Sequence, residues 1–431
     1  MINAGREGNL ASITRRDLSS GKRRAVAFFC MLETGHFQRL RPLISGLARG
    51  GIATHIFTHC KFRPQVEQAG GIFFDLFSKY PMEQADDESI PVPCRYVTFV
   101  ARYAEQIRRD VEEIGPSLII HDTFALIGRI IAELLDIPWV NVCAGHNATP
   151  ERILAVLRED PRVKVSPRCL QAVEVLRESY GLADASPFSY VSSISPHLNI
   201  YCEPQEFLDE EERRVFEPVA FYGSLLSPEE EPFDRQGRRA QFDSGSVGKV
   251  HVYVSFGTIV WRYYAADALR ALRTLAEAFS EFDKVRAVIS LGGVRIGDDA
   301  LTALARPNVS VEEYVDQWRI LQGADAFVTH QGMNSTHEAI FHRVPMISYP
   351  FFWDQPALAA KCRKLGLAIP LSESPRGEFG KDHVRAALAR LADEADSMKA
   401  ALSRAREWEL AVMEKRPSVH RRIGDLMEGR G

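Results

Sequence analysis

The sequence has no excess of positive charge, and this removes one large class of partners. Its 431 residues include 53 Lys and Arg against 57 Asp and Glu, a formal net charge of -4. No block of basic residues interleaved with aromatic residues occurs along the chain. Proteins that bind DNA or RNA gather Lys and Arg on the surface that meets the phosphates. Nucleic acid is therefore not an expected partner.

Long apolar runs are also missing. The most apolar stretch, residues 116–140, contains too many ionisable side chains for a segment that crosses a bilayer. The first 24 residues are polar and charged, without the apolar core of a secretion signal, so we expect a disordered lead-in. These absences predict a soluble, cytoplasmic protein. The ionisable residues of the stretch are His121, Asp122, Arg129, Glu133 and Asp136.

Cysteine is sparse, and several motifs of metal and redox chemistry are absent. The seven Cys lie at least 26 residues apart, their number is odd, and no C-x-x-C pair occurs. Reduced thiols fit this pattern better than a disulfide framework. The chain has no H-E-x-x-H and no D-x-D, so neither a protease zinc site nor a divalent cation that holds a diphosphate is indicated. We therefore expect no metal and no bound cofactor.

What the sequence does contain is a repeated alternation of strands and helices. With 45% hydrophobic residues, 431 residues exceed the size of most single cores, so two domains are expected. Short apolar runs alternate with helical stretches over 25–225 and again over 249–431, which predicts an α/β fold of two doubly wound, Rossmann-like domains. Residues 226–248 have the polar composition of a linker. The terminal amphipathic helix could cross back to the first domain.

Two such domains would face each other across a cleft, because ligands of open α/β sheets bind beyond the carboxyl ends of the strands. The first strand of the second domain ends at Gly257 and Thr258, small residues that let the backbone approach a phosphate. No G-x-G-x-x-G fingerprint follows a strand, so hydride transfer from NAD is disfavoured.

Residues 329–356, "THQGMNSTHEAIFHRVPMISYPFFWDQP", hold the densest set of polar candidates. An apolar strand runs into Thr329 and His330, Gly332 permits a tight turn, and a helix is predicted to begin near residue 334. The free N–H groups and the dipole of a helix start favour a bound anion. This strand, turn and helix therefore predict an anion site facing the cleft.

Residues 314–360 as a whole resemble the nucleotide-sugar signature of family 1 glycosyltransferases, the UDP-glycosyltransferases of the two-domain GT-B fold. The order in the family is W-x-x-Q, T-H-x-G-x-N-S-x-x-E, G-V-P and D-Q, and the similarity extends to bacterial natural-product members. The resemblance implies GT-B architecture and a nucleotide-sugar donor as co-substrate. It places Gln317 by the base, the diphosphate on His330, Gly332, Asn334 and Ser335, the ribose on Glu338, and the transferred sugar on Asp354 and Gln355.

The chain departs from this signature at two positions. Tyr314 stands where the family has the Trp that stacks on the base, and Arg343 stands where it has Gly before Val-Pro. Trp318 could replace the missing stacking residue, so both aromatic residues remain candidates. Glu338 favours UDP over dTDP, because a carboxylate that binds ribose uses the 2'-hydroxyl. The Asp-Gln pair favours a fully hydroxylated hexose, and UDP-glucose is the expected donor, with dTDP-sugars as the alternative.

In the first domain, "LETGHFQRLRP" places His36 at a helix start just past the first strand. The resemblance extends here, since family members carry G-H-x-x-P with His as general base. An imidazole with a pKa near 6.5 can accept a hydroxyl proton at neutral pH. Asp122, at the end of a later strand, is the expected orienting carboxylate. An N-cap role for Asp122 is the alternative, and His121 should face away.

We therefore expect an inverting, metal-independent hexosyltransferase that acts on a hydroxyl of a small lipophilic natural product, as in antibiotic biosynthesis. A GT-B sugar-nucleotide epimerase or hydrolase and a non-catalytic sugar-nucleotide-binding protein are the alternatives. Two groups could line the acceptor pocket or be core: Phe73, Phe74 and Phe77, and Tyr96, Phe99 and Tyr103. The loop 144–150 is a further pocket candidate. His337 and His342 are interpreted as helix-surface residues, and the oligomeric state is open.

Overall fold

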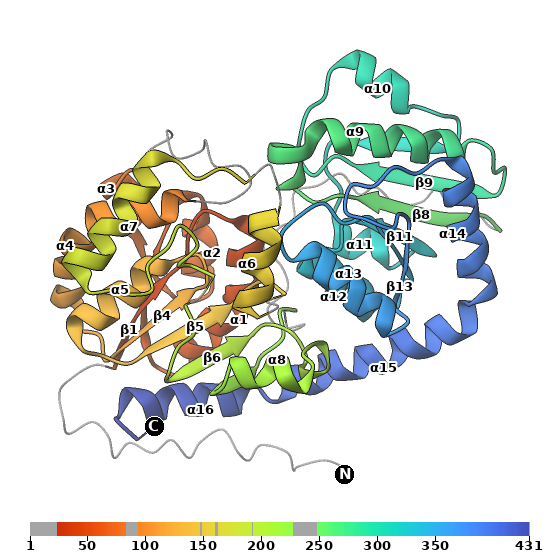
Figure 1. Cartoon of the computed structure of the whole chain (residues 1–431). Coiled ribbons are helices and arrows are strands. Elements are labelled where there is room, and N and C mark those ends of the chain that lie inside the picture. The colour runs from red at the N-terminus through yellow and green to blue at the C-terminus, as the bar shows by residue number, and fades with distance from the viewer. Residues whose placement is uncertain are drawn as a thin grey trace, which may run out of the picture.

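The computed structural model describes residues 24–82, 94–146, 149–159, 163–191, 193–226 and 248–430. Most of the predicted lead-in and linker, and residues 147 and 148 of the predicted pocket loop, lie outside these described residues. The chain forms two α/β lobes, each built around its own sheet, with a long helical segment running beneath both (Figure 1). The predicted fold class, two Rossmann-like units, is confirmed.

The first sheet has seven described strands in the order β3-β2-β1-β4-β5-β6-β7, and all neighbouring pairs are parallel. Every residue of β1, β4 and β5 is buried, as expected when helices cover both faces of a parallel sheet. The strands are β1 Ala25–Phe29, β2 Ala53–Thr58, β3 Ile72–Asp75, β4 Leu118–Asp122, β5 Trp139–Cys143, β6 Leu198–Tyr201 and β7 Val219–Phe221.

The second sheet has six described strands in the order β10-β9-β8-β11-β12-β13, and these are also parallel. The two sheets thus repeat one topology, and the predicted linker separates them in sequence. The strands are β8 Val250–Ser255, β9 Val285–Ser290, β10 Val309–Glu312, β11 Ala326–Thr329, β12 Met346–Ser348 and β13 Ala368–Pro370.

Helices connect the strands and cover both sheets (Figure 1). In the first lobe they are α1 Thr34–Arg49, η2 Cys60–Phe62, α2 Arg63–Gln68, α3 Leu76–Lys79, α4 Arg95–Ile114, α5 Leu126–Leu135, α6 Pro150–Glu159, α7 Pro167–Tyr180, η4 Gln205–Phe207 and α8 Glu210–Val215. In the second lobe they are α9 Val260–Phe279, α10 Asp298–Leu304, α11 Gln317–Leu321, α12 Met333–His342, α13 Gln355–Lys364 and α14 Lys381–Asp393, followed by α15 Ala395–Glu414 and α16 Arg416–Met427.

Each sheet has a point where the strand order reverses, and these two points determine where the functional residues lie. In the first sheet β1 lies between β2 and β4, so the chain leaves β1 and β4 in opposite directions. In the second sheet β8 lies between β9 and β11 in the same way. Ligands of doubly wound folds bind at such reversals, beyond the carboxyl ends of the strands. A ligand is therefore expected to contact the segments after β1, β4, β8 and β11.

The last two helices join the lobes. Helix α15 packs along α12 of the second lobe, and α16 packs on α1 of the first (Figure 1). The buried Arg416 donates hydrogen bonds to the carbonyl oxygens of Tyr222 at 2.9 Å and Leu225 at 2.5 Å. A Cβ on Gly46 of α1 would lie 2.2 Å from the His420 ring, so glycine allows this close approach. The predicted terminal helix, residues 398–415, corresponds to α15, and α16, which begins beyond it, makes the crossing to the first lobe.

Two absences can be stated for the part of the chain that the structure describes. No helix there is both long and apolar enough to traverse a lipid bilayer. All seven Cys are in described residues, and none forms a disulfide.

Candidate active site

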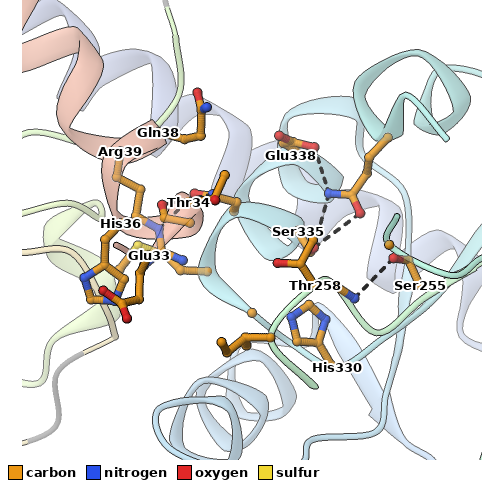
Figure 2. Close-up of a pocket in the computed structure, with 18 of the residues that line it drawn as sticks. Glu33, Thr34, His36, Gln38, Arg39, Ser255, Thr258, His330, Ser335 and Glu338 are labelled. Carbon is orange, nitrogen blue, oxygen red and sulfur yellow. Dashed lines mark hydrogen bonds between the residues drawn. The ribbon is translucent and has the colours of Figure 1, made fainter. Parts of the chain in front are cut away.

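A cavity of about 1380 Å³ lies between the two lobes. Its N-terminal wall is formed by the start of α1 and neighbouring loops, and its C-terminal wall by the segments that follow β8 and β11. Figure 2 shows His36 and Arg39 on the first wall, with Ser335 and Glu338 on the second. Ligand pockets for one drug-sized molecule occupy about 300–1,000 Å³, so this cavity has room for two reactants.

His36 and Asp122 are in direct contact on the N-terminal wall. The Nδ1 atom of His36 lies 2.8 Å from Oδ1 of Asp122. The carboxylate also accepts backbone N–H bonds from Met31 at 3.3 Å and Phe124 at 3.0 Å. Burial alone would raise the pKa of Asp122, but His36 and these N–H groups lower it below its ordinary value. Asp122 is thus held as a carboxylate that fixes the imidazole, leaving Nε2 to take a proton.

The alternatives for Asp122 and His121 are settled by the same geometry. The two backbone N–H groups that bond to Asp122 belong to Met31 and Phe124, both outside α5, and the N-cap of that helix is Ala125. Asp122 is therefore not the helix cap. His121 faces away from the cavity and is fully buried, and burial lowers its pKa to about 4. His121 is therefore neutral at pH 7 and packs inside the first lobe.

On the C-terminal wall, the strand β11 turns directly into α12. Gly332 is the N-cap of this helix, which begins at Met333, one residue before the predicted start. The ring of His330 fills the turn so closely that a Cβ on Gly332 would lie 2.3 Å from it, and one on Gly257 2.7 Å. Gly257 also has φ of 69°. Both glycines are thus required by the packing of His330, whose pKa burial lowers to about 4. This wall offers a helix start and a neutral imidazole to an anion.

Three predicted residues form a connected group at one end of the cavity. The side-chain amide of Gln317 donates to Oε2 of Glu338 at 2.8 Å and to Oγ of Ser335 at 3.2 Å. Residues three apart on a helix share a face, so α12 presents Ser335 and Glu338 together. The Glu338 carboxylate thus lies beside the anion-binding start of α12. A ligand with a sugar hydroxyl next to a phosphate could bind both.

Asn334, Asp354 and Gln355 have protein partners in addition to facing the cavity. The amide of Asn334 donates to the Gly35 carbonyl at 3.3 Å, across the cleft. Oδ2 of Asp354 accepts the backbone N–H of His146 at 3.0 Å. The side-chain oxygen of Gln355 accepts N–H bonds from its own turn, at Phe351 and Phe352. Asn334 and Asp354 therefore join the two walls, and Gln355 shapes the loop that carries Asp354.

Both candidates for the stacking aromatic residue line the cavity. Tyr314 is 42% exposed. Trp318 is half-buried and packs against α12, with its ring centroid 5.0 Å from that of Phe341 and 4.4 Å from that of His342. The more accessible ring face belongs to Tyr314.

The apolar part of the cavity is built from aromatic residues that the sequence analysis did not select. Phe124 stacks on His36 at 4.2 Å between ring centroids and meets Trp353 edge-on at 5.4 Å. Tyr190 is fully buried, does not reach the cavity, and stacks on Trp353 at 5.8 Å. We call Phe124 and Trp353, which line the cavity, together with Tyr190, which supports them from the core, the aromatic wall. The two proposed aromatic groups belong instead to the first lobe's core or pack against it: Phe73, Phe74, Phe77, Tyr96, Phe99 and Tyr103.

The interpretation of His337 as a surface residue is wrong. Its side chain is fully buried, and its Nε2 and Nδ1 atoms lie 2.9 Å from Glu203 Oε1 and 2.5 Å from Glu409 Oε1. The other oxygen of Glu203 lies 2.7 Å from Nδ1 of His146. Burial opposes ionisation, but the two carboxylates raise the pKa of His337 to about 10. We call His146, Glu203, His337 and Glu409 the interdomain network. His342 is half-buried beside Trp318.

Two other site residues were missed by the sequence analysis. Arg39 is 7% exposed and lines the cavity one helical turn after His36. Its signal was present, since Arg39 occupies the position of Pro in the related G-H-x-x-P pattern. Gly292 follows β9 with φ of 65°, and a Cβ there would lie 2.2 Å from the Gly257 carbonyl oxygen. The sequence "LGG" directly after an apolar run could have indicated that Gly292 ends a strand beside the cavity.

Among the described residues, no group of three or more His, Cys, Asp or Glu side chains is arranged to hold a metal ion. The chemistry that the described side chains can perform is proton transfer at His36 and anion binding at the start of α12.

Comparison with known proteins agrees with this geometry. Residues 204–402 match the family described as "UDP-glucoronosyl and UDP-glucosyl transferase". The NDP-glycosyltransferase YjiC of Bacillus subtilis (strain 168) is 26% identical over 352 residues, which cover 78% of this chain and 82% of the relative.

Two solved structures share the whole fold. The glycotransferase of kitacinnamycin superposes with a TM-score of 0.73 at 22% identity, covering 93% of this chain and 99% of the other. The spinosyn rhamnosyltransferase SpnG, complexed with thymidine diphosphate, has a TM-score of 0.61 at 18% identity, covering 92% and 99%.

Proposed function

Since this chain is a family 1 glycosyltransferase with the GT-B fold, we propose that it transfers a hexosyl group from a UDP-sugar to a hydroxyl of a small lipophilic natural product. UDP-glucose is the first donor to test. The observation that carries the proposal is the contact of His36 with Asp122 at 2.8 Å, in the same cavity as the start of α12. The proton acceptor, His36, and the anion site at the start of α12 thus line the same cavity.

The proposed reaction is a single displacement with inversion. His36 accepts the proton of the acceptor hydroxyl as its oxygen attacks the anomeric carbon from the side opposite the diphosphate. Asp122 stabilises the imidazolium that forms. The N–H groups at the start of α12, with His330 and Ser335, hold the negative charge of the departing diphosphate. No metal ion is required in this scheme, and an α-linked donor gives a β-glycoside.

The uridine nucleotide is proposed from the group around Glu338. Its carboxylate lies beside Ser335 and is oriented by Gln317 at 2.8 Å, where it can accept hydrogen bonds from both ribose hydroxyls. A dTDP-sugar is the second candidate, because a related fold has been solved with thymidine diphosphate. A site that binds a substrate hydroxyl discriminates strongly against an analogue without it. UDP-glucose should therefore stabilise the protein more than dTDP-glucose does at equal concentration.

The acceptor class is proposed from the aromatic wall. Phe124 packs on the His36 ring, so an apolar molecule resting on Phe124 and Trp353, which the buried Tyr190 supports, would bring its hydroxyl next to the base. A phenolic, macrolide or other polyketide alcohol fits this description. The reaction is placed in the cytoplasm, where sugar nucleotides are available.

The test is sugar transfer by the wild type and by His36→Ala. Each is incubated with UDP-glucose, EDTA and a panel of phenolic and polyketide alcohols, and glucoside and UDP are measured. Loss of a positioned general base should lower kcat about 100-fold to 10,000-fold. His55→Ala, a histidine change on β2, should retain wild-type activity. A His36→Ala enzyme with wild-type turnover would overturn the assignment.

Two controls separate the alternatives. A sugar-nucleotide epimerase or hydrolase would consume UDP-glucose without any acceptor, whereas a transferase needs one. A non-catalytic binding protein would show a rise in Tm with UDP-glucose but no product with any acceptor of the panel.

A further inference from the structure

Arg39 is a buried cation in the cavity to which the resemblance assigns no role. It lies in the first turns of α1, three residues after His36, and residues three apart on a helix share a face. Its side chain comes from the N-terminal wall and reaches toward α12 (Figure 2). With 7% of its surface exposed, its guanidinium is largely withdrawn from bulk water.

The guanidinium is held in place by the helix that is expected to bind the diphosphate. Its Nε donates to Oδ1 of Asn334 at 2.8 Å, and the Asn334 amide donates in turn to the Gly35 carbonyl. Asn334 is the second residue of α12. The cation is therefore fixed at the N-terminus of α12, where N–H groups already favour an anion.

Among the described residues, Arg39 has no carboxylate partner at ion-pair distance, and its guanidinium hydrogen bonds to the neutral side chain of Asn334. Burial lowers the pKa of Arg39, and the more distant charges of Asp354, Glu203 and Asp122 oppose this only in part. A buried charge is costly unless an opposite charge approaches it. Four of the five guanidinium N–H groups are not used by Asn334, and a planar guanidinium matches phosphate oxygens in a bidentate manner.

We propose that Arg39 is a further donor-binding residue, which contacts the diphosphate from the N-terminal wall and stabilises its charge as it leaves. This inference rests on the proposed function. It assigns the diphosphate one contact set from each lobe: the start of α12 from the second and Arg39 from the first. Binding of the donor would then draw the two walls together, and a fixed cation would take the place of a metal ion in the reaction.

The experiment compares UDP with uridine, because only UDP carries phosphates. Dissociation constants are measured by calorimetry for the wild type, Arg39→Met and Arg39→Lys. Arg39→Met should weaken UDP binding about 10-fold to 100-fold, as expected for loss of a charge-assisted contact. Uridine binding should stay the same. Arg39→Lys should bind UDP more tightly than Arg39→Met but less tightly than the wild type. Lysine keeps the positive charge but cannot form the two parallel hydrogen bonds of a guanidinium.

Arg41→Met is the matched control. Arg41 is also buried on α1 and hydrogen bonds to Gln38 and Gln68, so this change should leave the ratio of UDP to uridine affinity unaltered. If Arg39→Met weakens UDP and uridine equally, or weakens neither, Arg39 is only a structural tie and the proposal is overturned. If the wild type binds no UDP at all, the donor assignment fails first and this inference fails with it.

Discussion

Arg343 ends helix α12 in a backbone conformation that suits glycine. Its φ and ψ are 58° and 37°, in the left-handed region, and it is the C-cap of the helix. Helices commonly end with Gly in this region, because a Cβ there is strained. The Gly of the related sequences at this position is thus explained by backbone geometry, and its replacement here leaves a strained residue.

Arg343→Gly should raise the free energy of unfolding by about 0.5–1 kcal/mol, since relief of the strain outweighs the added freedom of the unfolded chain. Urea unfolding at neutral pH would measure this change. Arg421→Gly is the matched control, because Arg421 is exposed within α16 in ordinary helical geometry. That change should instead cost about 1 kcal/mol. A loss of stability in both variants would refute the strain argument.

The residues of the site differ in how far the sequence could predict them. His36 and Asp122 were predictable from the family resemblance, and the fold brings them together because His36 follows β1 and Asp122 ends β4, the neighbouring strand at the reversal of the first sheet. His337 was not, because helical periodicity within α12 gives no sign that Glu203 and Glu409 arrive from distant segments. Arg39 was overlooked because a Lys or Arg on a helix is usually solvated, and only the assembled cleft shows that it is buried.

Helix α16 depends on one glycine of another helix. Gly46 of α1 lies against the His420 ring, and Nε2 of His420 lies 2.7 Å from the Tyr222 hydroxyl. The close approach fixes α16 across the first lobe. A side chain at position 46 would have to displace the imidazole from Tyr222.

Gly46→Ala should therefore destabilise the protein. In the interior of a helix without such a contact, Ala is usually more stable than Gly by about 1 kcal/mol. The expected net loss is about 1–3 kcal/mol, the range for overpacking. In a His420→Ala background the same change should become neutral or stabilising. Urea unfolding of the four proteins gives the coupling energy. Equal effects of Gly46→Ala in both backgrounds would show that the two helices do not interact through this contact.

At the level of elements, alternation of apolar runs and helices predicted the parallel sheets well. The inner strands β1, β4, β5, β6, β11 and β12 are short and wholly buried, which leaves a clear mark in composition. The predicted terminal helix, residues 398–415, matches α15, whereas α16 was not predicted, although Pro417 stands in its first turn. A Pro in the first turn of α16 is compatible with a new helix start, and amphipathic periodicity continues on both sides.

The interdomain network links the stability of the whole molecule to pH. The pKa of His337 is raised from 6.5 to about 10, so its contribution is fully present below pH 6.5 and is lost as pH rises toward 10. The pKa of Glu203 is lowered from 4.5 to about 2: burial alone would raise it, but His146 and His337 outweigh burial. Its contribution is present above pH 4.5 and is lost as pH falls toward 2.

The wild-type Tm should therefore decrease between pH 6.5 and 10 and also below pH 4.5. His337→Gln should lose about 3–5 kcal/mol at pH 7, because Glu203 and Glu409 become buried carboxylates without a cation between them. Its Tm should no longer show the alkaline decrease that His337 causes. His55→Gln, on β2, should keep the wild-type profile. An unchanged alkaline slope in His337→Gln would mean that His337 is not protonated in the fold.

The chain passes between the lobes twice, once between residues 226 and 248 and again where α15 gives way to α16. Helix α16 lies on α1, which carries His36 and Arg39 at its other end. Because both residues belong to this one helix, the base and the cation must keep their spacing in any relative displacement of the lobes. The C-terminal crossing is thus coupled mechanically to both cleft residues.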